Sequence, residues 1–298
     1  MIIVKIDGGL GNQLFQYAFA RGVSSRLKTN FRLDINSYKT YYKNVRGYSL
    51  NCFNIKQNFA KDSDFLGFVW GRKHHKIFDL FYKYLRLKSK IMPFYYQEQT
   101  FHFDPRVFER DGTYFSGGWV TEKYFKDIAK EIREEITPVD LMSTESLTIL
   151  EKIKNSNAVS VHVRRYDTGP DKIYSNTIDI QGTCSLDYYR KAMGVVSARE
   201  KNPHFFVFSD NYVWASENLK SMPYTVTFVK NEGRKDYEDM ILMSSCKHNI
   251  IANSTFSWWG AWLNQNKDKI VVAPIRWLNN AKKSVNTKDV IPESWIKI

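Results

Sequence analysis

Cysteine is scarce in this 298-residue chain, and its spacing argues against two kinds of cross-linked protein. Cys52, Cys184 and Cys246 are odd in number, lie far apart and form no CxxC pair. Such a pattern predicts neither a disulfide framework nor a zinc site. We therefore expect three reduced thiols.

Long hydrophobic runs are missing as well. No stretch approaches the roughly 18 consecutive apolar residues that a membrane-spanning helix needs. The opening stretch, MIIVKIDGG, lacks the basic segment, long apolar core and cleavage site of a signal peptide. These absences predict a cytoplasmic protein.

Acidic residues are outnumbered by basic ones: the chain has 31 acidic and 44 basic residues, which gives a net charge of +13. A basic surface favours nucleic acid, anionic lipid or a phosphorylated ligand as a partner. The sequence contains neither zinc-finger spacing nor the aromatic motif of RNA-recognition sheets. No nucleic-acid partner is therefore expected.

The chain otherwise has the composition of a globular protein, with 43% hydrophobic and 15% aromatic residues. The first 35 residues read as strand, glycine turn, helix and strand, and the chain beyond about residue 155 alternates strands with helices, which predicts a doubly wound α/β fold. Residues 36–125 are irregular, and we expect short helices and loops there. We predict an N-terminal domain over residues 1–150 and a C-terminal domain over residues 151–298, with the connection near 138–155.

The clearest signal of a site is AVSVHVRRYDT, residues 158–168, in which an apolar strand ends in fixed positive charge. His162, Arg164, Arg165 and Asp167 lie around this strand end, and ligands of parallel sheets bind beyond the carboxyl ends of the strands. A guanidinium binds phosphate through paired hydrogen bonds and stays charged at neutral pH, so an arginine here suits a diphosphate. The alternative is an interdomain salt bridge between Asp167 and one of the arginines.

A second strand-to-helix turn, IIANSTFSWWGAW, covers residues 250–262. Asn253 or Ser254 is a good N-cap, and the amides of Thr255, Phe256 and Ser257 would form the first helical turn. Free N–H groups and the positive end of a helix dipole bind anions. Capping of the helix alone explains the same residues equally well.

Carboxylates follow at two further positions. Ser209 and Asp210 come just after the strand HFFVFS, where an aspartate can accept hydrogen bonds from ribose hydroxyls or guanine N–H groups or can cap a helix. In DYEDMILMSSC, Asp236 and Asp239 are the better candidates for a ligand contact. Most acidic side chains at such a helix start are solvated or favoured by the helix dipole.

The turn GGLGNQ, residues 8–13, follows the first strand and opens a helix, but it does not complete GxGxxG because position 14 is leucine. Its glycines, including Gly11, permit a tight turn and close backbone approach to a ligand. Asn12 and Gln13 add directed amides. Alone, this turn is a weak nucleotide signal.

Together, GGLGNQLFQYAFAR, HVRRYD, FSDN, DYEDMILMSSC and IIANSTFSWWGAWL resemble the α1,2-fucosyltransferases, glycosyltransferase family 11. The motifs occur in the family's order and cover both halves of the chain. The resemblance implies a GT-B enzyme with two Rossmann-like domains facing across a cleft and GDP-fucose held mainly by the C-terminal one. It also implies inverting transfer of L-fucose to the 2-hydroxyl of a β-galactoside, with no metal ion or other cofactor.

The resemblance also implies roles for individual residues. Arg164 or Arg165 would stabilise the β-phosphate of the departing GDP, a form of electrostatic catalysis that is often the largest single contribution to rate. The turn of residues 254–257 would hold the same diphosphate, and Asp210 would lie near the nucleoside. Asn12 would reach the phosphate or the fucose.

Inverting transfer further requires a group that takes the proton of the acceptor hydroxyl. Asp167 is our first candidate and His162 our second. Asp167 could equally orient an arginine.

Residues 36–125 are expected to select the acceptor, a galactose-containing glycan that is either free or lipid-linked. Within them, residues 65–96 combine many basic and aromatic side chains with a single acid, Asp79. This pattern is compatible with a basic amphipathic helix on anionic lipid at the inner face of the membrane, and also with a solvated basic face over an ordinary core.

Two rival functions stay open at this stage. A fucosyltransferase that forms another linkage would share the arginine motif, and linkage analysis of the product would identify it. A glycan-binding protein with the same fold would bind oligosaccharide without releasing GDP from GDP-fucose.

Overall fold

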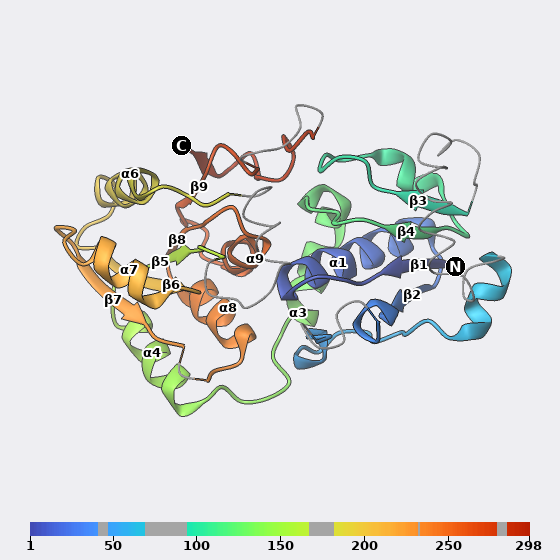
Figure 1. The fold of residues 1–298 in the computed structure, drawn as a ribbon, viewed down its shortest axis with the longest axis horizontal. Coiled ribbons are helices and arrows are strands. Elements are labelled where there is room, and N and C mark those ends of the chain that lie inside the picture. Colours follow the sequence, from blue (N-terminus) through green and yellow to red (C-terminus); the bar gives the residue numbers. More distant parts are fainter. Residues whose placement is uncertain (41–46, 69–93, 167–181, 232, 279–284) are drawn as a thin grey trace. The chain divides into compact units, whose positions relative to one another are not determined.

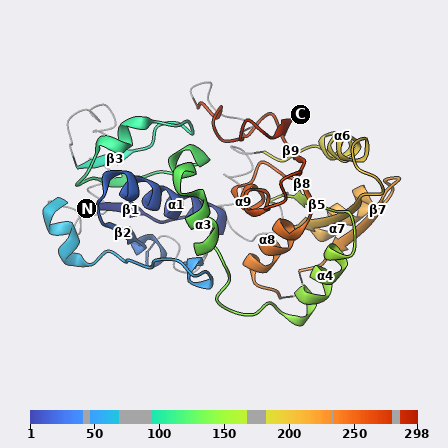
Figure 2. The ribbon, with the colours of Figure 1, turned by 180° about the vertical axis from the view of Figure 1, so that it is seen from behind.

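The chain divides into two compact units. The computed structural model describes residues 1–40, 47–68, 94–166, 182–231, 233–278 and 285–298. One unit comprises Met1–Thr137 and Lys288–Val290, and the other comprises Pro138–Thr287 and Ile291–Ile298. Each unit has its own sheet with helices packed on it (Figure 1; Figure 2 shows the view from behind).

The first unit is built on a four-stranded sheet of order β2-β1-β4-β3, in which every strand pair is parallel. Its strands and α-helices are β1 (Ile2–Lys5), α1 (Leu10–Leu27), β2 (Phe31–Asp34), β3 (Tyr95–Gln97), β4 (Tyr114–Ser116) and α3 (Ala129–Glu135). Short 3-10 helices lie at Asn36–Tyr38, Leu50–Cys52, Asp62–Phe68, Pro105–Glu109, Glu122–Tyr124 and Lys126–Ile128.

The turn between β1 and α1 requires glycine at one position. Gly8 has a φ of 77°, in the left-handed region that residues with a Cβ avoid. Its carbonyl oxygen accepts hydrogen bonds from the Tyr38 hydroxyl at 2.9 Å and from Nε2 of Gln13 at 3.1 Å. The turn is therefore held from two sides before α1 begins.

The second unit has a six-stranded sheet of order β10-β9-β8-β5-β6-β7, again with parallel pairs throughout. Its elements are α4 (Thr144–Lys154), β5 (Ala158–Val163), α6 (Leu186–Ser197), β6 (His204–Ser209), α7 (Tyr212–Leu219), β7 (Thr225–Val229), α8 (Asp236–Ser245), β8 (His248–Ile250), α9 (Thr255–Leu263), β9 (Val271–Ala273) and β10 (Ile296–Lys297).

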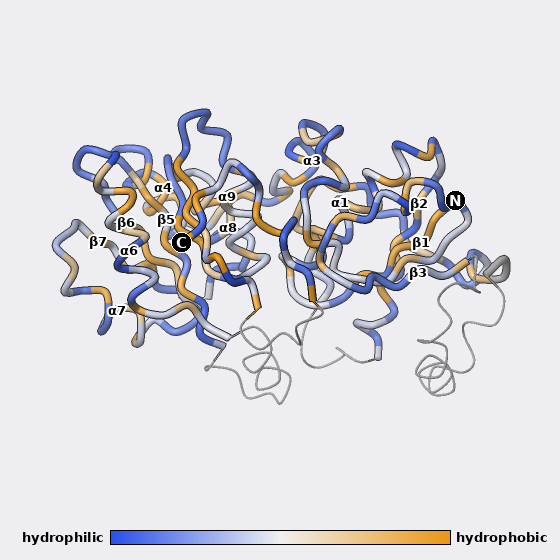
Figure 3. Tube along the Cα trace, turned by 90° about the horizontal axis from the view of Figure 1, so that it is seen from above, coloured by the Kyte–Doolittle hydropathy of each residue, from blue (hydrophilic) through white to orange (hydrophobic). Residues whose placement is uncertain are grey.

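Both faces of this second sheet are covered. Val159, Val161 and Val163 of β5 share a core with α6 and α7, whereas Ala158 shares a second core with α4 and α8. Strand β5 is accordingly buried at all six positions, and it appears as a hydrophobic segment in Figure 3. This arrangement confirms the doubly wound α/β fold expected from the alternation of strands and helices.

Helix α4 lies within residues 138–155, where the sequence placed the connection between the two domains. Ser143 caps the helix by accepting a hydrogen bond from the Ser146 amide at 3.3 Å. The same serine donates from its amide and hydroxyl to Oε2 of Glu238 on α8, at 3.0 and 2.6 Å. This contact adds to the packing of Ile149, Leu150 and Ile153, the apolar face of α4, in the core shared with α8. The Glu238 carboxylate is therefore paired with Ser143, although the sequence analysis expected most acidic side chains at the start of α8 to be solvated.

The segment Lys288–Val290 belongs to the first unit, although it lies close to the C-terminus. Asp289 is its anchor: one carboxylate oxygen accepts from Nζ of Lys123 at 2.6 Å and the other from the amide of Phe103 at 2.9 Å. No local sequence pattern indicates this return. It follows from tertiary pairing alone.

At Gly22 in α1 we expect alanine to be less favourable than glycine, which is the reverse of the usual helix propensities. A Cβ at this position would lie 2.1 Å from the carbonyl oxygen of Tyr124, which is backbone and cannot rotate away. Glycine to alanine inside a helix ordinarily gains up to about 1 kcal/mol. We expect Gly22→Ala instead to lower the free energy of unfolding by about 1–3 kcal/mol through overpacking, as measured by urea denaturation.

Gly194 in α6 is the matched control, because the nearest atom to an added Cβ would be the Tyr224 hydroxyl at 4.0 Å. Gly194→Ala should raise the free energy of unfolding by about 0.5–1 kcal/mol. Stabilisation by both substitutions would show that α1 does not pack on the backbone of residue 124 in this way.

Candidate functional site

The second sheet reverses its strand succession between β5 and β8. Strands β5, β6 and β7 follow one another outward on one side, and β8, β9 and β10 follow on the other. Such a switch point separates the loops that leave the two central strands, and it is where open α/β sheets bind their ligands. The loop after β5 begins with Arg164, and the loop after β8 leads to Ser254.

The Asp210 carboxylate organises the loop after β5. Its two oxygens accept hydrogen bonds from the amides of Arg165 at 2.8 Å and Tyr166 at 2.9 Å. Oδ2 also lies 3.4 Å from Nε of Arg164. Tyr166 has a φ of 61°, which is unusual for a residue with a side chain, so these bonds hold a turn that would otherwise be unfavourable.

Helix capping is not the role of Asp210. Asn211 is the N-cap of α7, and its side chain accepts from the Trp214 amide at 2.9 Å. The neighbouring Ser209 hydroxyl donates to the Asn211 carbonyl at 3.0 Å. Contact of Ser209 or Asp210 with a nucleoside stays a prediction.

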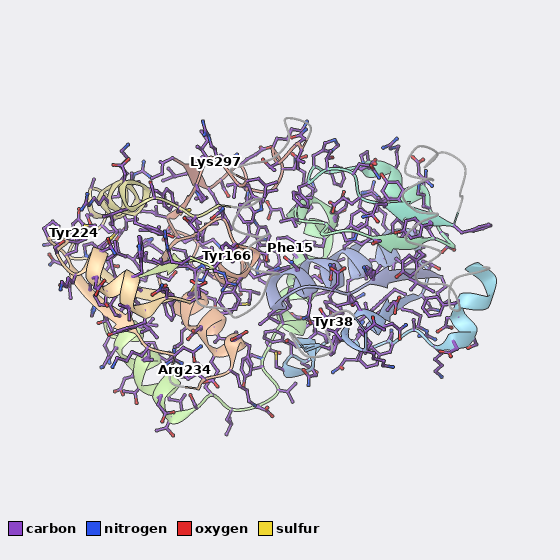
Figure 4. All side chains as sticks on the ribbon, in the orientation of Figure 1. Phe15, Tyr38, Tyr166, Tyr224, Arg234 and Lys297 are labelled. Carbon is purple, nitrogen blue, oxygen red and sulfur yellow. The ribbon has the colours of Figure 1, made fainter. Side chains whose placement is uncertain are left out.

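The two adjacent arginines are held by different neighbours. The Arg164 guanidinium lies 4.6 Å from the ring centre of Tyr166, a residue that Figure 4 labels. That of Arg165 lies 4.3 Å from the ring of Trp214, and its Nη1 donates to the Thr183 hydroxyl at 3.2 Å. Both arginine side chains are only half-buried. Their positive charge is therefore fixed in place and still borders solvent.

The N-terminus of α9 begins at Ser254, whose side chain makes no capping hydrogen bond. The Ser257 hydroxyl donates to the Ser254 carbonyl at 3.3 Å. The ring of Phe256, in the first turn, lies 5.6 Å from the ring of His162 on β5. This contact places the start of α9, including Thr255, beside the end of β5.

Asn253 is buried and anchors a neighbouring segment. Its amide donates to the carbonyls of Gly182 and Trp277, each at 3.3 Å, and its oxygen accepts from the Cys184 thiol at 3.5 Å. Because this segment includes Thr183, Asn253 supports the partner of Arg165. The sequence did not indicate Thr183, which no short motif marks.

His162 is completely enclosed, and burial together with the nearby Arg164 lowers its pKa to about 3. The imidazole is therefore neutral at physiological pH and a weak base, which argues against our second candidate for the proton acceptor. Asp167, the first candidate, lies outside the described residues. Its roles as a base or as an ion-pair partner stay predictions.

The two aspartates at the start of α8 that the sequence singled out, Asp236 and Asp239, lie in different environments. Asp236 is exposed, whereas Oδ1 of Asp239 accepts from Nη2 of Arg234 at 2.6 Å. Burial raises the pKa of Asp239. Arg234, labelled in Figure 4, also donates to the Lys230 carbonyl, so the pair closes the loop between β7 and α8. Sequence reasoning missed Arg234.

In the first unit, Gln13 is buried and its amide is used within the protein. Nε2 donates to the carbonyls of Gly8 and Gly47, each at 3.1 Å, and Oε1 accepts from the Ser49 amide at 2.9 Å. Gln13 therefore ties two loops together, and its contact with a donor stays a prediction. Asn12 is half-buried, and its contact with a donor, like that of the buried Gly11, stays a prediction.

Two features of the described residues concern metal binding and membrane insertion. No three histidine, cysteine or carboxylate side chains gather there into a group that could hold a metal ion. No helix in those ranges combines the length and apolar character needed to cross a bilayer. Cys52, Cys184 and Cys246 are all free thiols.

The two parallel-sheet α/β units, together with the similarity to a solved structure, show a fold of the GT-B type. The structure is similar to that of an Arabidopsis thaliana FUT1 mutant solved in complex with GDP, with a TM-score of 0.50 and 13% sequence identity. The similarity covers 91% of this chain and 69% of that one.

The model of glycosyl transferase family 11 matches residues 87–298. Over 309 residues, the chain is 32% identical to an α-1,2-colitosyltransferase of Escherichia coli, covering 100% of this chain and 99% of that protein. The protein belongs to glycosyltransferase family 11.

Other relatives have related names. The O-antigen biosynthesis glycosyltransferase WbnK of Escherichia coli is 32% identical, over 98% of this chain and 99% of its own length. The Homo sapiens galactoside α-(1,2)-fucosyltransferase 1 is 29% identical over 47% of this chain and 40% of its own length.

The geometry around Asp210 generates a prediction about local stability. In Asp210→Asn, one carboxylate oxygen becomes an NH₂ group that faces a backbone N–H donor. We expect the free energy of unfolding to fall by about 1–3 kcal/mol, because a buried hydrogen bond to a charged acceptor is lost. The Arg165 and Tyr166 amides should also exchange their hydrogens faster, as measured by hydrogen-exchange mass spectrometry.

Asp187→Asn on α6 is the control for the change in charge. Its carboxylate is 68% exposed and pairs with Lys191 one helical turn away. It should leave both measurements nearly unchanged. Equal protection of the two amides in wild type and Asp210→Asn would contradict the role assigned to Asp210.

Proposed function

We propose that the protein transfers L-fucose from GDP-fucose to the 2-hydroxyl of a galactose-terminated glycan, with inversion, to form an α1,2 linkage. The observation that carries this proposal is the pair Arg164 and Arg165 at the switch point of the second sheet, held by Asp210 and next to the N-terminus of α9. Fixed positive charge beside a helix N-terminus suits a diphosphate.

The same geometry suits the departure of GDP. As the bond between fucose C1 and the diphosphate breaks, negative charge grows on the β-phosphate. Arg164 and Arg165 are already oriented by stacking and by Asp210, so they stabilise this charge without rearranging. We infer that these groups make a metal ion unnecessary.

The relatives support the choice of donor and linkage. Two of their names specify transfer of colitose or fucose in α1,2 linkage, and one of these two specifies a galactoside acceptor. The name of another places that protein in O-antigen biosynthesis, which favours a glycan acceptor. We propose that this acceptor is free or lipid-linked and that transfer takes place at the inner face of the membrane. The proposed lipid-contacting segment, residues 65–96, lies for the most part outside the described residues.

A second donor deserves the same test. Colitose is fucose without its 3-hydroxyl, and a relative that matches the whole chain is named as a colitosyltransferase. GDP-colitose would use the same diphosphate site. The two donors differ only in the sugar contacts.

The deciding experiment measures GDP release in the presence of EDTA, with GDP-fucose, GDP-colitose and GDP-mannose as donors and a panel of β-galactosides as acceptors. We expect release to require both a 6-deoxy donor and a galactoside. Arg164→Ala and Arg165→Ala should each lower kcat/KM by about 100-fold or more, the loss typical of removing one group that stabilises transition-state charge.

Arg190→Ala on α6 removes the same charge at an exposed position of the same unit and should retain full activity. Release that needs added metal, prefers GDP-mannose or survives both strand-end substitutions would refute the proposed donor site. Glycan binding with no GDP release would indicate a binding protein, and linkage analysis of the product would reveal any linkage other than α1,2.

A further inference from the structure

In the first unit, Glu98 follows β3 and holds the loop of residues 117–119, the β4 loop, which leaves the neighbouring strand β4. Its Oε2 accepts hydrogen bonds from the amides of Gly118 at 2.6 Å and Trp119 at 3.0 Å. Trp119 has a φ of 54°, in the left-handed region that residues with a Cβ avoid. The two bonds therefore stabilise a turn that would otherwise be unfavourable.

Gly117 lets the backbone of this loop come close to the carboxylate. A Cβ at position 117 would lie 2.5 Å from Cβ and 2.8 Å from Oε2 of Glu98. At the far end of the loop, the Trp119 side chain is fully buried, and its ring stacks on that of Phe19 with 3.9 Å between the ring centres. The core thus anchors Trp119, whereas the glycine part of the loop depends on Glu98.

Two polar atoms oppose this closed arrangement. Oε1 of Glu98 and Nε1 of Trp119 are shielded from solvent, and neither has a hydrogen-bond partner among the described residues. Buried polar atoms in proteins are nearly always paired, and an unpaired one costs free energy. The cost is much greater for an ionised oxygen than for a neutral one, so the charge on Glu98 affects how stable the closed loop is.

Burial raises the pKa of Glu98 to about 7, and the two amide hydrogen bonds only partly oppose the shift. The titratable neighbour among the described residues is Tyr124, on the short helix Glu122–Tyr124. Burial raises the pKa of Tyr124 well above its usual value, so this side chain stays neutral. The β4 loop itself consists of Gly117, Gly118 and Trp119, which carry no charge. The Glu98 carboxyl therefore gains or loses its charge near neutral pH without an ionic partner.

We propose that Glu98 is a pH-sensitive switch of the β4 loop: the loop is closed while the carboxyl is protonated, and it opens more often once the carboxyl is ionised. The loop lies at the carboxyl end of β4, where open parallel sheets bind their ligands, so the switch acts on the ligand edge of the first unit. This inference goes beyond the proposed function and does not rest on it.

The direction of the pH dependence follows from the two states of the loop. In the open loop the carboxylate is hydrated, and its pKa returns toward the ordinary value of 4.5. The closed loop holds the proton more tightly, so its stabilisation is complete below about pH 4.5 and is lost as the pH rises to about 7. Above that pH both states are ionised, and the balance between them no longer changes.

The experiment measures hydrogen exchange of the peptide spanning residues 116–121 by mass spectrometry from pH 5 to pH 9. Each rate is divided by the intrinsic exchange rate of an unstructured peptide at the same pH, which gives a protection factor. In the wild type we expect protection to fall about 10-fold for each pH unit between pH 5 and pH 7, and then to stay level.

Two substitutions of Glu98 separate its charge from its hydrogen bonds. Glu98→Gln retains a carbonyl oxygen for the amides of Gly118 and Trp119 but cannot ionise. Its protection should match that of the wild type at pH 5 and should not change with pH. Glu98→Ala removes the acceptor, so we expect low protection at every pH.

Glu131→Gln, at an exposed position of α3, is the matched control for removal of an acid from the same unit and should follow the wild type at every pH. Wild-type protection that is the same at pH 5 and pH 7, or an equal decline in Glu98→Gln, would overturn the proposal. Exchange is measured on the protein without substrate, so this result stands apart from the test of fucosyl transfer.

Discussion

The Asp210 carboxylate is the interaction on which the basic end of β5 depends. Two arginines that are adjacent in sequence bring like charges to one strand end, and the turn that follows includes a non-glycine residue, Tyr166, in the left-handed region. One carboxylate offsets both problems by accepting two backbone amides and lying against Arg164. The positive charge is therefore in place before any ligand arrives, which is the condition under which electrostatic catalysis is most effective.

The two units share a parallel-sheet architecture, but their loops carry side chains of opposite charge. Each has a parallel sheet, and in each an amide side chain ties loops together, Gln16 in the first unit and Asn253 in the second. The sheet edge of the second unit presents arginines, which suit a diphosphate. In the first unit the Glu98 carboxylate accepts two backbone amides of the loop after β4.

The internal pairing of polar side chains explains where motif reasoning succeeded and where it failed. HVRRYD indicates a charged strand end correctly, because the apolar run and the arginines are contiguous in sequence. Gln13 occurs in an equally suggestive motif, yet its amide is consumed by three backbone partners from two loops. Arg234 lies outside every motif, although its pairing with Asp239 closes a loop at the same sheet edge as the arginines.

The sequence by itself determined the α/β class, the strand that ends in arginine and the family, because hydrophobic periodicity and contiguous motifs are local properties. Only the tertiary structure decided which polar side chains are paired inside the protein and which border the sheet edges. It brought Asp210 to Arg164 across 46 positions of the chain and set Glu98 against Gly118 and Trp119. Burial then shifted two pKa values in opposite directions, lowering that of His162 and raising that of Glu98. Desolvation disfavours the charged form of any group, and the degree of desolvation depends on neighbours that are distant in sequence.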